Sequence, residues 1–323
     1  MKLRANAMKK ENAKKISILV IVLSIIAFLI VLNNFQNRRF KMIEKIVKVN
    51  DVNIYTESIG NSKNPAILLM MGATASMIWW DDQFCKKLAD RGYYIIRYDN
   101  RDTGKSTFYK SGTTPYTILD LADDAVAVLD SYKIGKAHLI GMSLGGMIAQ
   151  VIAIRNPTLI KTMILVSSSV WDDLPELPPM EKKLTDYYSI LATLDWTNKN
   201  EVQKYIIGNW RLMNGSKYSF DENRAIELAN IEIERAKNIQ SMFNHAMLKG
   251  GESLYGKSNQ INLPVLIIHG TEDPVLPFPH ALTLNKTIPN STLLKLDGRG
   301  HEIHKEDWDL LIDNIYNHIK VSH

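Results

Sequence analysis

The sequence predicts an α/β fold in which a mostly parallel sheet is flanked by helices and interrupted by a helical cap, with an N-terminal transmembrane anchor in front. Three observations lead to this prediction. Short apolar segments typical of buried strands alternate with helical patterns, as expected for a parallel sheet covered on both faces. Strand patterns are lost over residues 171–260, where apolar residues recur with helical spacing. Residues 16–32 are almost entirely apolar.

The N-terminal apolar run has the length and composition of a membrane-spanning helix. Its only polar residues are Ser17 and Ser24, and a spanning helix needs about 17–25 residues. Bulky residues follow the run where signal peptidase requires small ones, so an uncleaved signal anchor is predicted. Basic residues are denser before the run than after it, which favours a cytoplasmic N-terminus. The sequence therefore predicts a single-pass membrane protein whose main domain is extracytoplasmic.

The main domain is predicted to begin with a β-hairpin over residues 46–60 that turns at Asn50-Asp51. Strands are predicted at 66–71, 93–98, 137–140, 162–166, 265–269 and 291–296. Helices are predicted at 118–132, where one face is apolar, and at 147–153 and 308–319. The predicted regions are a basic tail (1–15), the anchor (16–33), a linker (34–45), a first core part (46–170), the cap (171–260) and a second core part (261–323).

Charge and composition exclude several classes of function. The net charge of +5 is concentrated in residues 1–15, which hold six Lys or Arg and one Glu. The remaining chain is close to neutral and has no basic patch interleaved with aromatics, so no nucleic-acid partner is expected. The single cysteine, Cys85, excludes a disulfide framework and a multi-cysteine metal site. No histidine pair has metal-ligand spacing, and no cofactor is predicted.

One short segment imitates a nucleotide-binding loop. The tripeptide Gly104-Lys105-Ser106 matches the end of a phosphate loop, but Asp99 stands where the first glycine is required. No helix is predicted directly after it, so nucleotide binding is not expected.

The chemistry is predicted to centre on Ser143. The segment Gly141-Met142-Ser143-Leu144-Gly145 lies between a predicted strand and a predicted helix, which is the context of a nucleophile elbow. In such a turn the serine Oγ is lifted clear of the sheet, and the N–H of Leu144 can face a developing oxyanion. A dinucleotide fingerprint is excluded because Ser143 occupies its second glycine position. The alternative is a chance strand–turn–helix that contains a serine.

A nucleophilic serine needs a base and an acid that orients it, and both follow in the expected order. Asp273 comes after the predicted strand at 265–269, and His301 after the strand at 291–296. His301 would accept the serine proton, and Asp273 would hold the imidazole in the correct tautomer. Glu272, beside Asp273, and Asp172, after the strand at 162–166, remain alternatives for the acid. His269 is predicted to be a core histidine.

The oxyanion needs two backbone donors. Leu144 supplies one, and the second is expected from the loop after the first buried strand, at Ala73.

With these residues in place, the chain resembles the α/β-hydrolase superfamily over about residues 46–323. The segments 69–80 and 97–106 resemble the subgroup that includes aclacinomycin-type methylesterases. That group's nucleophile, acid and base fall on Ser143, Asp273 and His301. The resemblance implies carboxylic-ester hydrolysis without a cofactor. One departure is Met71, which stands where many members have histidine before the glycine.

The predicted function is that of a membrane-anchored serine hydrolase acting through an acyl-enzyme on a small or medium apolar ester. Its expected partners are that small-molecule ester and, through the N-terminal helix, the membrane. One alternative keeps the triad in a cofactor-free haloperoxidase-like enzyme or a C–C bond hydrolase. Another is a non-catalytic sensor that uses the pocket to bind a ligand.

Overall fold

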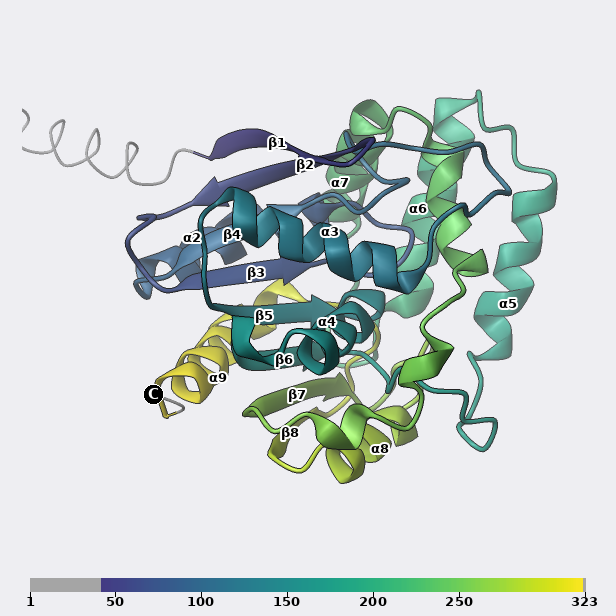
Figure 1. Ribbon diagram of the computed structural model, residues 1–323. Helices are drawn as coiled ribbons and strands as arrows, with labels where there is room; N and C mark the ends of the chain where they lie inside the picture. Colours follow the sequence, from purple (N-terminus) through teal and green to yellow (C-terminus); the bar gives the residue numbers. More distant parts are fainter. Residues whose placement is uncertain (1–41, 322–323) are drawn as a thin grey trace, which may run out of the picture. The chain divides into compact units, whose positions relative to one another are not determined.

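The computed structural model describes residues 42–321, and the chain divides into two compact units, Met1–Met42 and Ile43–His323. The second unit is built on an eight-stranded sheet with the strand order β1-β2-β4-β3-β5-β6-β7-β8 (Figure 1). The strands are β1 (Ile43–Val49), β2 (Val52–Ile59), β3 (Ala66–Met70), β4 (Tyr94–Tyr98), β5 (Ala137–Met142), β6 (Ile160–Val166), β7 (Val265–Gly270) and β8 (Ser291–Leu296). The first two strands are antiparallel, β2 pairs antiparallel with β4, and all other pairs are parallel.

Helices cover both faces of the sheet, as the alternating pattern predicts. Figure 1 shows α3 (Ile118–Ser131), α4 (Leu144–Arg155) and α8 (Pro279–Thr287) on one face, with α2 (Asp82–Asp90) and α9 (Trp308–Val321) on the other. Every residue of β3 and of β4 is buried between these layers. The central strands therefore consist of continuous apolar runs rather than alternating ones.

Local sequence determines where these helices begin. Helix α3 starts with a capping box, in which the Thr117 side chain and the Asp120 side chain each bond the other's backbone N–H. Leu121, Ala125 and Val128 then point into the core from one face of the helix. The predicted helix at 118–132 thus ends within one residue of the observed one.

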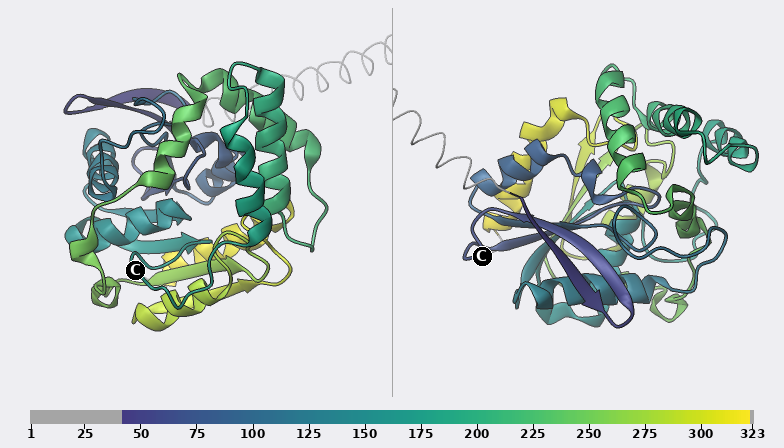
Figure 2. Two further views of the ribbon diagram at one scale, coloured as in Figure 1. Left: turned by 90° about the vertical axis from the view of Figure 1, so that its right-hand side faces the viewer. Right: turned by 90° about the horizontal axis from the view of Figure 1, so that it is seen from above.

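The region between β6 and β7 is helical. It contains α5 (Lys182–Tyr188), α6 (Lys199–Met213) and α7 (Glu222–Arg235), which lie beyond the carboxyl ends of the parallel strands (Figures 1 and 2). Helices α6 and α7 share a small apolar cluster of their own, formed by Val202, Tyr205, Ile206, Ile207, Ala225 and Ala229. We call residues 171–260 the cap.

The predicted fold class requires one correction, which concerns the transmembrane anchor. Among residues 42–321, no helix is long and apolar enough to cross a membrane. The longest of the described helices, α6, has 15 residues and carries Lys199, Glu201, Lys204 and Arg211, whereas a span needs about 17–25 mostly apolar residues. The segment predicted as the anchor, 16–33, lies outside the described residues. The mostly parallel sheet with helices on both faces and a helical cap agrees with the prediction, whereas the anchor is not supported by the described residues.

Candidate active site

Ser143 lies in a sharp turn between β5 and α4. Its backbone has φ 50° and ψ −118°, a conformation that is strained for any residue with a Cβ. A side chain at Gly141 would come 2.2 Å from the carbonyl oxygen of Gly145, so only glycine fits there. The Ser143 N–H donates to the carbonyl of Val166 at 2.9 Å. The backbone around the serine is therefore held by its neighbours in the sheet.

Of the two predicted oxyanion donors, Leu144 follows Ser143 directly and Ala73 follows a glycine that lies against it. Leu144 is the first residue of α4, and the first N–H groups of a helix have no partner inside it. Gly72 lies against the serine, because a Cβ there would be 3.2 Å from the Cβ of Ser143. Ala73 follows Gly72, and the next N–H, from Thr74, donates to His245 Nδ1 at 3.1 Å. The loop that carries Ala73 is thereby tied to the cap.

The structure brings the predicted acid and base into direct contact. Nδ1 of His301 is 2.7 Å from Oδ2 of Asp273. The other carboxylate oxygen of Asp273 accepts from the N–H groups of Val275 at 2.9 Å and Leu276 at 2.8 Å. Burial by itself would raise the pKa of Asp273, but the attraction and hydrogen bond of His301 outweigh it and lower that pKa. An ionised Asp273 accepts the Nδ1 proton, which leaves Nε2 of His301 as the basic nitrogen.

The two alternative acids are engaged elsewhere. Glu272 accepts from the N–H of Ser216 at 2.8 Å and from its hydroxyl at 2.7 Å. Asp172 accepts from the N–H of Gly256 at 2.9 Å. Asp273 is thus the carboxylate that meets His301 in the structure.

A second histidine adjoins the acid, and sequence reasoning did not assign it a place in the site. His269 is buried at the end of β7, with Nε2 2.7 Å from the carbonyl oxygen of Leu276 and 3.3 Å from Oδ2 of Asp273. Burial lowers the pKa of His269, which favours its neutral form. The neutral ring donates its Nε2 proton to the carbonyl of Leu276, the residue whose N–H bonds Asp273. The position four residues before Asp273 was the one available signal.

The cap is joined to the loop that carries the base. His301 donates its N–H to the carbonyl of Met213 at 2.8 Å, and Lys217 donates its N–H to the carbonyl of Gly298 at 2.9 Å. The N–H of Gly215 bonds the Glu302 carboxylate at 3.2 Å. Burial raises the pKa of Glu302 to about 7. The turn between α6 and α7 is therefore part of the support of His301.

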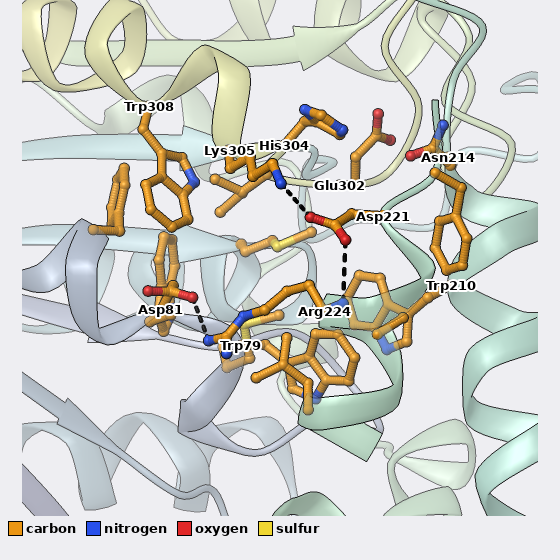
Figure 3. Close-up of a pocket in the computed structure, with 18 residues that line it drawn as sticks. Trp79, Asp81, Trp210, Asn214, Asp221, Arg224, Glu302, His304, Lys305 and Trp308 are labelled. Carbon is orange, nitrogen blue, oxygen red and sulfur yellow. Dashed lines mark hydrogen bonds and ion pairs between the residues drawn. The ribbon is translucent and has the colours of Figure 1, made fainter. Parts of the chain in front are cut away.

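A mostly apolar cavity of about 120 Å³ opens beside these loops (Figure 3). Met71 and Met142 line it from just before Gly72 and Ser143, and Ile303 lines it from just after the His301 loop. Its aromatic walls are formed by Trp79, Trp80, Phe84, Trp210, Phe220 and Trp308. Ion pairs of Asp81 with Arg224 and of Asp221 with Lys305 connect core and cap beside it. The cavity can take an apolar group, and it is lined by the residue that precedes Ser143 in the chain.

Two other kinds of reactive group, a bound metal ion and a cysteine nucleophile, can be compared with the described residues. Within residues 42–321, no group of three or more His, Cys, Asp or Glu side chains could hold a metal ion. Burial raises the pKa of the Cys85 thiol to about 12, so this cysteine is not an activated nucleophile.

Comparison with known proteins defines the class. The chain belongs to the serine aminopeptidase S33 family of α/β hydrolases, whose model matches residues 62–307. It is 29% identical to the rhodomycin D methylesterase of Streptomyces sp. (strain C5), over 80% of this chain and 92% of the relative. The corresponding enzyme of Streptomyces peucetius is 27% identical over the same shares. The resemblance to methylesterases is thereby confirmed, and the protein is a hydrolase.

Solved structures confirm the fold. The esterase RhEst1 from Rhodococcus sp. ECU1013 superposes with a TM-score of 0.71 at 20% identity, covering 87% of this chain and 99% of that one. A 2-hydroxy-6-oxo-6-phenylhexa-2,4-dienoate hydrolase from Rhodococcus sp. strain RHA1 gives 0.68 at 22% identity, with the same coverage. At these identities the likeness concerns the fold alone.

Proposed function

We propose that this hydrolase cleaves carboxylic esters with Ser143 as nucleophile, His301 as general base and Asp273 as the acid that orients it. The observation that carries the proposal is the 2.7 Å contact between His301 Nδ1 and Asp273. It occurs together with the strained turn at Ser143, whose φ is 50°. Both features lie at the carboxyl ends of parallel strands, where catalytic groups collect in open α/β sheets.

The proposed reaction proceeds in two halves. His301 Nε2 takes the proton of the Ser143 hydroxyl while Oγ attacks the ester carbonyl, and the N–H groups of Ala73 and Leu144 stabilise the oxyanion. The intermediate collapses as the proton passes from His301 to the leaving alcohol, which gives an acyl-enzyme. In the second half, His301 takes a proton from water as the water attacks the acyl group. Collapse of this intermediate releases the acid and, with the proton returned from His301, the free serine.

We expect a small or medium apolar ester as substrate. The apolar lining of the cavity beside the catalytic loops includes six Trp or Phe and two Met side chains, which favour apolar groups. The two named relatives are methylesterases, and this is the activity that we carry over as a proposal. The cap, which closes this cavity, is the part of the chain that would select among esters.

The test is an ester-library screen with the purified chain, combined with labelling by a serine-reactive phosphonate. We expect hydrolysis of apolar carboxylic esters and stoichiometric labelling that disappears in Ser143→Ala. Cleavage of β-diketones without cleavage of esters would instead identify a C–C bond hydrolase. Absence of both labelling and turnover would favour a ligand-binding protein.

A further inference from the structure

A histidine of the cap connects the loop after β3 to the loop after β4. His245 is buried and lies in the 3₁₀ helix η4 (Ile239–Met247). Its Nδ1 accepts from the N–H of Thr74 at 3.1 Å, and its Nε2 is 2.8 Å from the carbonyl oxygen of Arg101. Both ring nitrogens are therefore bonded to backbone groups of the core.

These two partners fix the protonation state of the ring. The carbonyl of Arg101 can only accept, so Nε2 carries a proton, whereas the N–H of Thr74 can only donate, so Nδ1 carries none. Burial lowers the pKa of His245, which favours the same neutral form. The ring thus acts as an acceptor toward the loop after β3 and as a donor toward the loop after β4.

The residue whose N–H bonds His245 has a strained backbone. Thr74 has φ 58°, in the left-handed region, where a β-branched side chain is a genuine outlier. Among residues 42–321, it is the one β-branched residue with a positive φ. Such a conformation persists only where the surrounding structure holds it. The bond to His245 is one of the contacts that hold Thr74.

Ala73, the proposed second oxyanion donor, lies between two residues whose positions are fixed. On one side, Gly72 lies against Ser143, since a Cβ at Gly72 would be 3.2 Å from the Cβ of Ser143. On the other side, the bond to His245 fixes the direction of the Thr74 N–H and hence the plane of the peptide that joins Ala73 to Thr74. An oxyanion donor is most effective when its direction is set before the reaction begins.

We propose that His245 is a positioning residue of the oxyanion hole, which accepts the N–H of Thr74 and so holds the loop with the N–H of Ala73 directed at the reacting carbonyl oxygen. This inference rests on the proposed esterase function and adds a cap residue to its machinery. His245 touches neither the serine nor the ester. It acts through the backbone of the loop after β3.

The helix that carries His245 is also docked on the core by other side chains. The Ser241 hydroxyl donates to the carbonyl of Asp102 at 3.1 Å. The Asn244 side chain donates to the carboxylate of Asp102 at 3.1 Å and to the carbonyl of Lys110 at 3.2 Å. The ring of His245 can therefore be replaced while η4 stays attached to the core.

Two substitutions separate the two bonds of the ring. His245→Asn places an amide oxygen near the position of Nδ1 and keeps an acceptor for Thr74, whereas His245→Gln places an amide nitrogen near Nε2 and keeps a donor for Arg101. We expect His245→Gln to lower kcat on a chromogenic ester by about tenfold to 10²-fold, because loss of a whole oxyanion donor costs about 10²–10³. KM should change by less than about threefold, and His245→Asn should keep at least about a third of the wild-type kcat.

Ser241→Ala is the matched control, because it removes a bond between η4 and the core without touching Thr74. It should lower the melting temperature and leave kcat unchanged. If His245→Asn loses as much kcat as His245→Gln, or more, the histidine only anchors the cap and the inference is wrong. Should these variants fold poorly, β-(4-thiazolyl)alanine and β-(3-thienyl)alanine at position 245 keep a five-membered ring and differ by N or C–H at the place of Nδ1. The thienyl ring should then show the larger loss of kcat.

Hydrogen exchange separates this inference from the proposed function. In Ser143→Ala, which does not turn over, the amide of Thr74 should exchange slowly, and NMR should detect faster exchange when His245→Gln is added but not when His245→Asn is added. If the intact chain hydrolyses no ester and this pattern is found, His245 holds the loop and the esterase proposal fails. If hydrolysis is normal and neither kcat nor the exchange of Thr74 distinguishes the two variants, the esterase proposal stands and the inference about His245 fails.

Discussion

The core and the cap differ in the groups that connect them to the site residues. In the core, backbone groups position the reacting side chains: the N–H of Ser143 is fixed by Val166, and Asp273 accepts the N–H groups of Val275 and Leu276. In the cap, side chains make many of the attachments. Arg235 on α7 contacts Asp99 at 2.8 Å.

This difference has a consequence for substitutions. A side chain that is replaced in the core leaves its backbone supports intact, so the loss falls on the chemistry. Replacing a cap side chain that makes such a contact removes the attachment itself, so the loss falls on stability and on substrate binding. The four predictions below test that division, and they run from the largest expected effect to the smallest.

Removal of the nucleophile should have the greatest effect on catalysis. We expect Ser143→Ala to lower kcat by a factor on the order of 10⁶, the scale for loss of the serine in a serine protease. The melting temperature should stay within a few degrees, because the N–H to Val166 remains. Ser62→Ala, in an exposed loop, is the control and should leave both values unchanged. Substantial activity in Ser143→Ala would contradict the serine mechanism.

Replacement of the acid comes next. Asp273→Asn should keep the turn at β7 but favour the wrong imidazole tautomer of His301, with a loss on the order of 10⁴ in kcat. The same substitution at Asp172, whose carboxylate bonds Gly256, should cost less than about tenfold. Both are measured on one chromogenic ester at neutral pH. The reverse order of damage would transfer the role of the acid to Asp172.

A buried carboxyl in the cap predicts a dependence of stability on pH. Glu232 accepts from the hydroxyl of Ser76 at 2.8 Å and from Trp79 Nε1 at 2.9 Å, and burial raises its pKa from 4.5 to about 7. The unfolded chain releases this proton at lower pH than the folded one. The group therefore stabilises the fold fully below pH 4.5, and this contribution is lost as the pH rises to about 7, by on the order of 3 kcal/mol at most.

Chemical denaturation of the wild type and of Glu232→Gln between pH 4.5 and 8 measures this contribution. The stability of the wild type relative to the variant should fall as the pH rises, because glutamine does not titrate. Glu227→Gln, an exposed position on the same helix, serves as the control and should follow the wild type. A difference between wild type and Glu232→Gln that does not vary with pH would show that Glu232 titrates normally.

The smallest effect is expected at the rim of the cavity. Arg224 pairs with Asp81 across the junction of cap and core, and about a third of its side chain is exposed, so the pair contributes no more than about 1 kcal/mol. Arg224→Ala should raise KM by less than about fivefold and should lower kcat by a smaller factor than it raises KM. Arg155→Ala breaks a surface pair with Asp123 on the core and should change neither. A large fall in kcat with Arg224→Ala would mean that the cap positions the reacting groups directly.

Much of the core could be predicted from the sequence, because its signals are local. Apolar runs identified the buried strands, and α4 extends only a few residues beyond its prediction at each end. The turn at Ser143 was recognisable because it needs glycine at Gly141, where a Cβ would meet the Gly145 carbonyl. The order of the acid and the histidine along the chain likewise follows from the order of the strands.

Tertiary structure alone decided which groups meet. Asp273, Glu272 and Asp172 were all acceptable acids in the sequence, and only the fold shows that His301 bonds Asp273. The place of His269 beside that acid, the raised pKa of Glu302 and the bond from Thr74 to His245 depend on residues far away in the chain. Local patterns carry no information about such contacts, since burial and pairing arise when distant segments pack together. The segment 16–33, predicted as an anchor, lies outside the described residues, and no helix within residues 42–321 is long and apolar enough to cross a membrane.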